Sequence, residues 1–205
     1  MIDDCGLKIG IADWDCRLEL QIQFANESSI CNLQFLRAPM IVYQGRVFSV
    51  EVDTRRFPDG RNHEVAVVRH PPSVVLIPIE HDGRVVLIEQ YRASVDRKLW
   101  ELPAGSLEPG ESADAAARRE CEEEIGRAPA RVERLGAWYP TPGFCDEQLI
   151  FFRVSDLRAP APDSPHRPDD DEDIQPKTVT IEEARRMVAR GEIVDLKTAF
   201  GLTLV

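Results

Sequence analysis

The chain has 205 residues, of which 43% are hydrophobic, so it is long enough to bury one core of ordinary size. Its 25 Lys and Arg residues are outnumbered by 36 Asp and Glu residues, which gives a net charge of −11. This balance argues against a nucleic-acid partner, because such binding depends on neutralising phosphates. An anionic substrate would need a divalent cation beside it.

The location of the protein is predicted from three features of its sequence. Apolar runs such as 74–77 are far shorter than the ~20 residues that cross a bilayer. The start of the chain carries Asp3 and Asp4, where a secretory signal is basic. The five cysteines are odd in number and widely spaced, which favours neither disulfides nor a zinc site. We therefore expect a cytoplasmic protein with no membrane partner.

The first half of the chain is predicted to be rich in strands. Residues 1–39 show no clear turn signals, and we assign this N-terminal extension no role. Apolar residues alternate or run together at 47–52, 64–68, 74–79 and 84–89, and turn residues separate these strands. The turn at 81–84 predicts a β-hairpin. We expect an N-terminal antiparallel strand region at 40–70, followed by the main domain at 71–205.

The second half is predicted to mix helices with strands. Strong helix formers occupy 112–125, and Gly126 and Pro129 end that helix. Two more strands are expected at 132–138 and 148–154.

The chain then enters a loop at 158–173, which holds four prolines and an acidic run. A capping box of Thr180 and Glu183 opens a second helix, which Gly191 ends, and a third helical piece starts at Leu196. Strands on both sides of helices indicate an α/β layered sandwich.

The chemistry is concentrated on the helix at 112–125. Glu120, Glu123 and Glu124 project from one face of it, because positions three and four apart are neighbours on a helix. Their mutual repulsion costs a few tenths of a kcal/mol per pair (about 0.2–0.5) and calls for compensation. Hard oxygen ligands on a rigid element suit Mg²⁺ or Mn²⁺. The alternative is a solvated acidic face.

This segment resembles the signature of the Nudix hydrolases, in which a glycine, a glutamate and an Arg-Glu-x-x-Glu-Glu-x-Gly group stand at fixed spacing. The matching residues are Gly105, Glu111, Arg119, Glu120, Glu123, Glu124 and Gly126. Cys121 and Arg127 depart from the signature at two positions where an aliphatic residue is usual. The resemblance implies a Nudix-type α/β/α sandwich with a mixed β-sheet for residues 71–205, and hydrolysis of a nucleoside diphosphate linked to another moiety.

The resemblance also implies roles for residues of the signature. Glu120 and Glu124 would bind Mg²⁺, or alternatively Mn²⁺, together with the backbone carbonyl of Ala104, and Glu123 would share this cluster as a catalytic residue. Glu111 and Arg119 would form a structural ion pair. With Gly105 and Gly126 they make up the four residues of the signature that would be structural.

The flanking segments resemble those of the ADP-ribose pyrophosphatase subgroup, which implies hydrolysis of ADP-ribose to AMP and ribose 5-phosphate. Arg92 would contact the diphosphate, a task that suits the forked guanidinium, although it could also be a surface charge. Glu101, in the segment that enters the signature, would bind substrate. So would Pro142 and Gly143, which lie in a downstream segment at 139–147.

The acidic run at 169–173 gains a role from the same resemblance. In the subgroup, a glutamate of this loop acts as general base or as an extra metal ligand, and Glu172 is the best match. Asp171 and Asp173 are close alternatives, and a merely solvated loop is another. An EF-hand is rejected because no glycine stands at the required position.

Other functions are compatible with most of these residues. The chain could be a pyrophosphatase of GDP-mannose or of another nucleotide sugar, or an enzyme acting on nucleoside triphosphates. It could also be a non-catalytic ADP-ribose sensor, although sensors usually lose carboxylates that are all present here. The resemblance further implies a homodimer in which strands at 43–69 exchange between subunits. Base and sugar preference stay open.

Overall fold

The computed structural model describes residues 18–19, 36–37, 39–166 and 174–205. The chain divides into two compact units. The smaller unit takes in residues 1–44 and 49–67, and the larger unit takes in residues 45–48 and 68–205. Among the described residues, no helix is both long enough and apolar enough to cross a membrane.

The smaller unit is made of strands. A three-stranded sheet has the order β3 (Met40–Gln44), β4 (Ser49–Arg56) and β5 (Asn62–Arg69), and a two-stranded antiparallel sheet pairs β1 (Leu18–Glu19) with β2 (Leu36–Arg37). Strand β4 begins two residues later than the predicted strand at 47–52. Strand β3 lies inside the strand region expected at 40–70, although it was not predicted as a separate strand, and all five of its residues are exposed.

The larger unit contains two sheets. The first has the order β10 (Ala128–Trp138), β11 (Leu149–Arg158), β6 (Ser73–Pro78) and β9 (Ala104–Ser106). It is mixed, because β11 and β6 run parallel while its other pairs are antiparallel. The second sheet is antiparallel, with the order β12 (Ile174–Val179), β7 (Val85–Arg92) and β8 (Arg97–Glu101).

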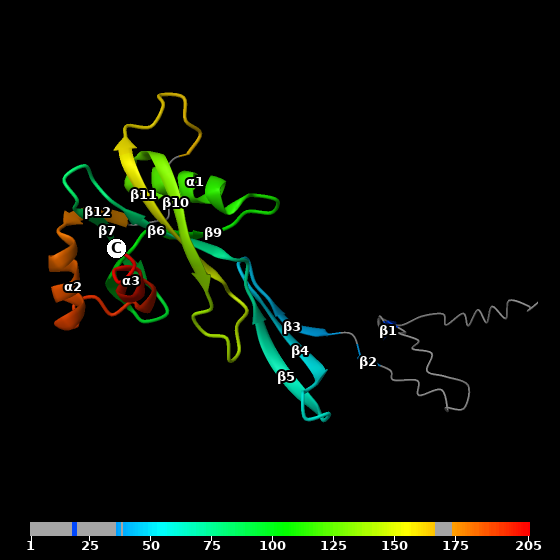
Figure 1. Ribbon diagram of the computed structural model, residues 1–205. Helices are drawn as coiled ribbons and strands as arrows, with labels where there is room; N and C mark the ends of the chain where they lie inside the picture. Colours follow the sequence, from blue (N-terminus) through cyan, green and yellow to red (C-terminus); the bar gives the residue numbers. More distant parts are fainter. Residues whose placement is uncertain (1–17, 20–35, 38, 167–173) are drawn as a thin grey trace, which may run out of the picture. The chain divides into compact units, whose positions relative to one another are not determined.

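Helices cover these sheets on two sides (Figure 1). Helix α1 (Ala113–Ile125) packs on one face, while α2 (Ile181–Ala189) and α3 (Leu196–Gly201) pack on the other. Side chains alternate along β6, so Val74 belongs to the core on the α1 side and Val75 to the core on the opposite side. Burial on both faces explains the continuous apolar run of this strand. The predicted α/β/α sandwich with a mixed sheet is confirmed.

Helix α1 begins and ends where its sequence predicts. The hydroxyl of Ser112 accepts a hydrogen bond from the Ala115 N–H at 3.2 Å and caps the first turn. At the other end, Gly126 adopts a left-handed conformation with φ of +64°, and its N–H donates to the carbonyls of Cys121 and Glu122. Glycine adopts this conformation at little cost, which gives Gly126 its structural part in the signature.

Three strands of the larger unit were not predicted, and β10 starts earlier than expected. Strands β8 and β12 contain charged or polar residues where an apolar alternation would signal a strand, and β9 has only three residues. Pro129 was read as part of a helix stop. It lies instead in β10, an edge strand, where a missing backbone N–H is tolerated.

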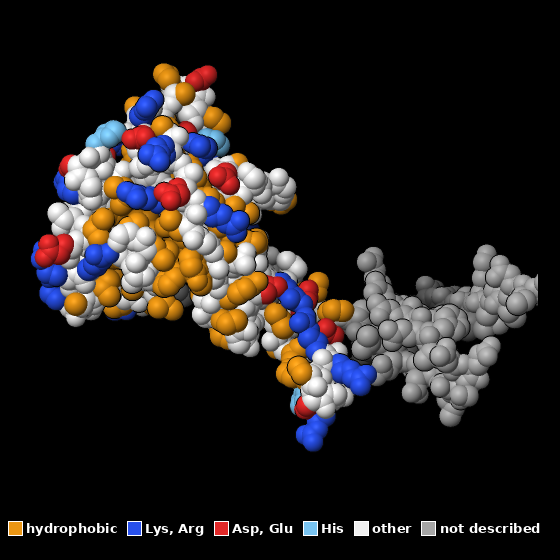
Figure 2. Space-filling model, in the orientation of Figure 1, with side chains coloured by type: hydrophobic (Ala, Val, Ile, Leu, Met, Phe, Trp, Pro, Cys, Tyr) orange, Lys and Arg blue, Asp and Glu red, His pale blue; other side chains and the backbone are white. Residues whose placement is uncertain are grey.

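The surface of the larger unit mixes charge with apolar area. On the face drawn in Figure 2, positive and negative side chains are interspersed, and hydrophobic side chains gather between them. Trp138, Tyr139 and Leu196 are among the exposed large apolar residues of this unit, and all three line an apolar hollow together with Phe200.

Candidate active site

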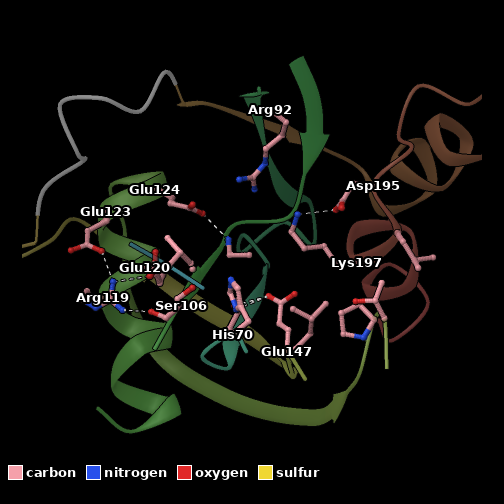
Figure 3. A pocket seen from close by; sticks show the side chains of 18 of the residues that line it. His70, Arg92, Ser106, Arg119, Glu120, Glu123, Glu124, Glu147, Asp195 and Lys197 are labelled. Carbon is pink, nitrogen blue, oxygen red and sulfur yellow. Dashed lines mark hydrogen bonds and ion pairs between the residues drawn. The ribbon is translucent and has the colours of Figure 1, made fainter. Parts of the chain in front are cut away.

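The larger unit contains a cavity of about 690 Å³ that is lined mainly by polar side chains (Figure 3). Its walls come from α1, β9, the end of β7, the start of α3, and the segments that flank β6 and β11. Cavities that bind small molecules typically measure roughly 300–1,000 Å³. The size and polarity suit a charged small molecule.

One wall of the cavity is formed by the glutamates of α1. Glu120, Glu123 and Glu124 all line it, as their spacing predicted. Glu120 and Glu124 are each only 7% exposed. An Oε atom of Glu124 accepts a hydrogen bond from the Ala104 N–H at 2.8 Å, which ties α1 to β9. The carboxylates are therefore held by the fold and do not form a solvated acidic face.

Gly105 allows Glu120 to approach the backbone of β9. A Cβ atom built on Gly105 would lie 1.9 Å from Oε1 of Glu120 and 2.1 Å from its carboxyl carbon. Real Cβ atoms do not come so close to another atom. The structural part predicted for Gly105 thus has a direct cause, because any side chain would occupy the place of the carboxylate.

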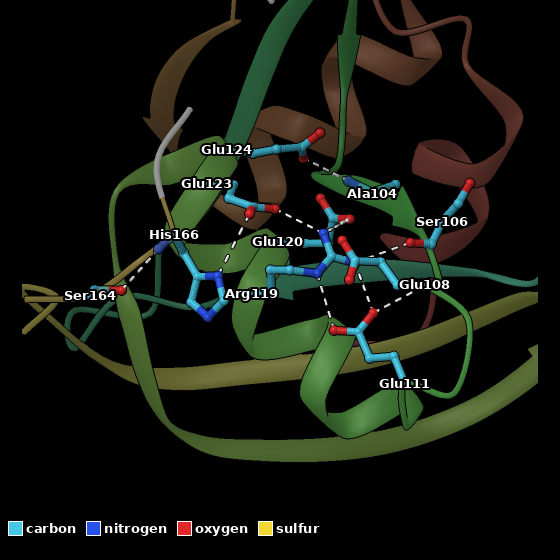
Figure 4. Close-up of polar contacts among 10 residues, drawn as sticks. All are labelled: Ala104, Ser106, Glu108, Glu111, Arg119, Glu120, Glu123, Glu124, Ser164 and His166. Atoms are coloured by element: carbon cyan, nitrogen blue, oxygen red, sulfur yellow. Dashed lines mark hydrogen bonds and ion pairs between the residues drawn. The ribbon is translucent and has the colours of Figure 1, made fainter. Parts of the chain in front are cut away.

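Arg119 binds three carboxylates at once (Figure 4). Its Nε and Nη2 donate to the two oxygens of Glu111 at 3.1 and 2.9 Å, and Nη1 donates to Glu120 at 2.7 Å and Glu123 at 2.8 Å. Nη2 also donates to the Ser106 carbonyl at 3.1 Å. The hydrogen bond from Arg119 is the main reason why the pKa of Glu111 lies below its ordinary value. The expected pair with Glu111 is present, and Arg119 also neutralises part of the glutamate cluster.

The donor set of this wall fits a hard divalent cation. Three carboxylates face one guanidinium, so the cluster keeps an excess of negative charge, and Gly105 leaves room for Glu120. Within the part of the chain that the structure describes, no three His, Cys, Asp or Glu side chains are gathered tightly enough to hold a metal ion as they stand. Arg119 and the Ala104 N–H contact carboxylate oxygens that such an ion would use.

A cationic wall lies across the cavity from the glutamates (Figure 3). Nε and Nη2 of Arg92 donate to the two oxygens of Glu101 at 2.8 and 2.7 Å, and Lys197 donates to the same carboxylate. Burial raises the pKa of Glu101, but the bonds from Arg92 and the charge of Lys197 outweigh it and hold this pKa below its ordinary value. The bond to Glu101 likewise raises the pKa of Arg92.

The position of Glu101 differs from the expectation that it binds substrate. Its side chain is 1% exposed, and both oxygens accept bonds from Arg92 or Lys197. Glu101 does not line the cavity, and its carboxylate contacts two cations that do. Arg92 lines the cavity.

A third wall of the cavity is formed by residues that the sequence did not predict. Ser73 donates to Oε1 of Glu147 at 2.9 Å, and Nδ1 of His70 lies 3.6 Å from the same oxygen. All three residues line the cavity. Glu147 is more than 70 positions from the other two, and a parallel bridge between Val68 and Cys145 brings the two segments together. Only a tertiary contact brings them together, so no local motif could signal them.

Two further predicted residues do not line the cavity, and a third is not described by the structure. Pro142 and Gly143 are exposed and do not line the cavity, although their neighbours Pro140 and Thr141 do. The predicted general base, Glu172, lies outside the described residues.

The loop that leads toward Glu172 is tied to α1. Ser164 donates to a carboxylate oxygen of Glu122, and Nδ1 of His166 lies 3.7 Å from Oε1 of Glu123 (Figure 4). These contacts bring the end of the described loop beside the glutamate wall.

Known proteins share this arrangement of sequence and fold. The NUDIX domain family matches residues 69–197. An ADP-ribose pyrophosphatase of Bacillus subtilis is 31% identical over 161 residues, covering 78% of this chain and 86% of the relative. Another, from Mycobacterium tuberculosis, is 32% identical over 165 residues, covering 80% and 79%. A crystal structure of an ADP compounds hydrolase superposes with a TM-score of 0.64 at 20% identity, covering 83% of this chain and 94% of that one.

Proposed function

Because the chain belongs to the Nudix hydrolase family, we propose that it hydrolyses the diphosphate bond of ADP-ribose to AMP and ribose 5-phosphate. The observation that carries the proposal is a single cavity with the glutamates of α1 on one wall and Arg92 on the other. Two relatives that match most of this chain are named ADP-ribose pyrophosphatases, which supports the choice of substrate.

Hydrolysis adds water across the bond between the two phosphates. The water oxygen bonds to one phosphorus, the bridging oxygen leaves with the other phosphate, and one proton must be accepted from the water. Glu120 and Glu124 would hold Mg²⁺ or Mn²⁺, with Ala104 as a further ligand and Glu123 beside them. When bound, such an ion offsets phosphate charge and lowers the pKa of a coordinated water.

The other residues act on the substrate and on the water. Arg92 is held by Glu101 so that its guanidinium faces the cavity, and it stabilises the charge of the phosphate oxygens. Glu172 accepts the proton of the water, and Asp171 and Asp173 are the alternatives for this step. Arg119 keeps the glutamates in place and partly neutralised before substrate arrives.

The partner and location form part of the same proposal. Met40, Ile41, Val42 and Tyr43 are each more than half exposed on the edge strand β3. An exposed apolar edge strand supports pairing with a second copy of the chain, as expected for a homodimer. We place the enzyme in the cytoplasm, with a small nucleotide-sugar substrate and neither nucleic acid nor membrane as partner.

The test is an analysis of products with Mg²⁺ and a panel of ADP-ribose, GDP-mannose and nucleoside triphosphates. We expect AMP and ribose 5-phosphate from ADP-ribose. Glu120→Gln should lower kcat by about 10³-fold or more, because it removes a proposed metal ligand while keeping the volume of the side chain. Glu108→Gln, which changes an exposed glutamate, is the matched control.

Each other outcome identifies a different error. Turnover of GDP-mannose alone would leave the proposed mechanism in place and change the assigned nucleobase of the substrate. Binding of ADP-ribose with no turnover of any compound would identify a sensor. Near-normal turnover by Glu120→Gln would remove the metal assignment.

A further inference from the structure

Lys197 is a cavity residue to which the proposed mechanism gives no part. It lies on α3 and lines the cavity with Arg92 and the glutamates of α1. Its side chain is only 14% exposed, and its ammonium contacts Glu101 and, at 3.1 Å, an oxygen of Asp195. A lysine that is this deeply placed and faces a polar cavity differs from an ordinary surface lysine, whose charged end is solvated.

The fold fixes the position of Lys197 from two sides. Asp195 caps α3, and its Oδ2 accepts from the Thr198 N–H at 3.0 Å and from the Thr198 hydroxyl at 2.5 Å. The Thr198 hydroxyl oxygen in turn accepts from the buried Leu102 N–H at 2.7 Å. The start of α3 is thus joined to the segment that carries Glu101. Lys197 is preorganised, so little conformational entropy is lost when it binds a ligand.

Glu101 couples Lys197 to Arg92. One buried carboxylate accepts two bonds from the guanidinium and one from the ammonium, so both cations are held on the same wall. Of the contacts seen among the described residues, Arg92 uses Nε and Nη2, and Lys197 uses two of its three N–H donors. Nη1 of Arg92 and one N–H of Lys197 are left for a ligand.

The charges on this wall determine how it binds. Two cations, Arg92 and Lys197, are balanced by two carboxylates, Glu101 and Asp195. The wall therefore attracts an anion through directed donors at short range and not through a net charge. A diphosphate presents two adjacent anionic groups, which match a pair of cations anchored on one carboxylate.

We propose that Lys197 binds the substrate diphosphate as a second cation beside Arg92, with Glu101 and Asp195 as the residues that position it. This inference rests on the proposed function, because it assigns a further ligand to the same substrate. Lys197 contacts the diphosphate in the ground state and in the transition state alike, so it contributes to binding more than to the chemical step.

The test replaces Lys197 and measures binding and turnover separately. Lys197→Gln should raise KM for ADP-ribose about tenfold while kcat changes less than about threefold. It should also weaken the binding of inorganic pyrophosphate by about tenfold, measured by calorimetry at fixed Mg²⁺. Lys197→Arg should restore most of both losses, because it returns a cation. Lys177→Gln changes a lysine of β12 that lies over the Trp100 ring, and it should leave KM and the affinity for pyrophosphate unchanged.

The outcomes separate this inference from the proposed function. Unchanged KM and pyrophosphate affinity in Lys197→Gln would overturn the inference. So would weaker binding that Lys197→Arg does not restore, if the melting temperatures of these variants are also lowered, because the loss would then be structural. If the unaltered protein does not hydrolyse ADP-ribose but Lys197→Gln still weakens pyrophosphate binding, the proposed substrate is wrong and the diphosphate site stands.

Discussion

At the scale of single residues, Gly105 is the position where one added methyl group would displace a proposed metal ligand, Glu120. Gly105→Ala places a Cβ atom within 2 Å of a Glu120 oxygen, so either the carboxylate or β9 must move. We expect a loss of about 1–3 kcal/mol in the free energy of unfolding. Turnover of ADP-ribose should fall at least 10²-fold, because small misplacements of catalytic groups are costly. Urea denaturation and steady-state kinetics measure the two effects.

A matched variant makes this result specific. Gly143→Ala adds the same methyl group where no other atom lies within 4 Å, and its cost should stay below about 0.5 kcal/mol. Activity of Gly105→Ala equal to that of the unaltered protein would show that the contact between β9 and Glu120 has no bearing on catalysis.

Individual site residues were predictable only where their spacing is local. The positions of Glu120, Glu123 and Glu124 on one helical face follow from their sequence separation. The pair of Arg119 with Glu123 has the same i,i+4 spacing. The bond from Arg119 to the Ser106 carbonyl of β9 is a tertiary contact, which helix spacing does not encode. The contact of Ser73 with Glu147 depends on a crossing of distant segments, which no local pattern encodes.

At the scale of elements, α1 carries the glutamate wall, and its first turn depends on Ser112. Ser112→Ala removes the acceptor for the Ala115 N–H and should cost about 1 kcal/mol of stability, as other cap removals do. Ser112→Asp keeps a capping oxygen and should lose much less. Thermal denaturation of both variants checks this, and equal melting temperatures would mean that the cap contributes nothing.

Helices were predicted better than strands because their ends carry chemical signals. Ser112 and Gly126 mark the ends of α1, and Thr180 caps α2 by accepting from the Glu183 N–H, as its sequence predicted. The Glu183 carboxylate, however, bonds Arg186 and Arg190, so the reciprocal half of the expected capping box is replaced by ion pairs. Strand β12 has no comparable signal, since Pro176 interrupts its pattern and only its pairing with β7 defines it.

At the scale of the whole molecule, the carboxylates with lowered pKa values make stability depend on pH. The pKa of Glu101 in the folded protein lies below its ordinary value of 4.5. The stabilisation that its charged form provides is therefore complete above about pH 4.5 and is lost as the pH falls through the lower, folded value. The free energy of unfolding should decrease with acidification in that range.

Comparison with Glu101→Gln isolates this contribution. The variant lacks the titrating group, so its stability deficit relative to the unaltered protein should shrink as the pH is lowered from 7 to 3. Denaturant unfolding at a series of pH values measures the difference. A deficit that stays constant over this range would mean that Glu101 keeps the same proton occupancy in both states.

The overall architecture was predictable in part, from β6 and from the order of elements. The apolar run of β6 predicted a strand, and the order of strands and helices along the chain predicted the layered sandwich. An unbroken apolar run is also typical of a strand buried on both faces, which the structure shows for β6. The limits of the smaller unit depend on pairings among β3, β4 and β5, which are contacts between strands and not features of one segment.

The central place of β6 has a consequence for the dynamics of the larger unit. All six of its residues are buried, and the strand lies between β11 and β9 with a helical layer on either side. We therefore expect its amide hydrogens to exchange with deuterium mainly through opening of the whole unit, because buried core strands have the highest opening free energies. The exchange lifetime of β6 is therefore a direct gauge of global opening, against which local opening near the glutamate wall can be distinguished.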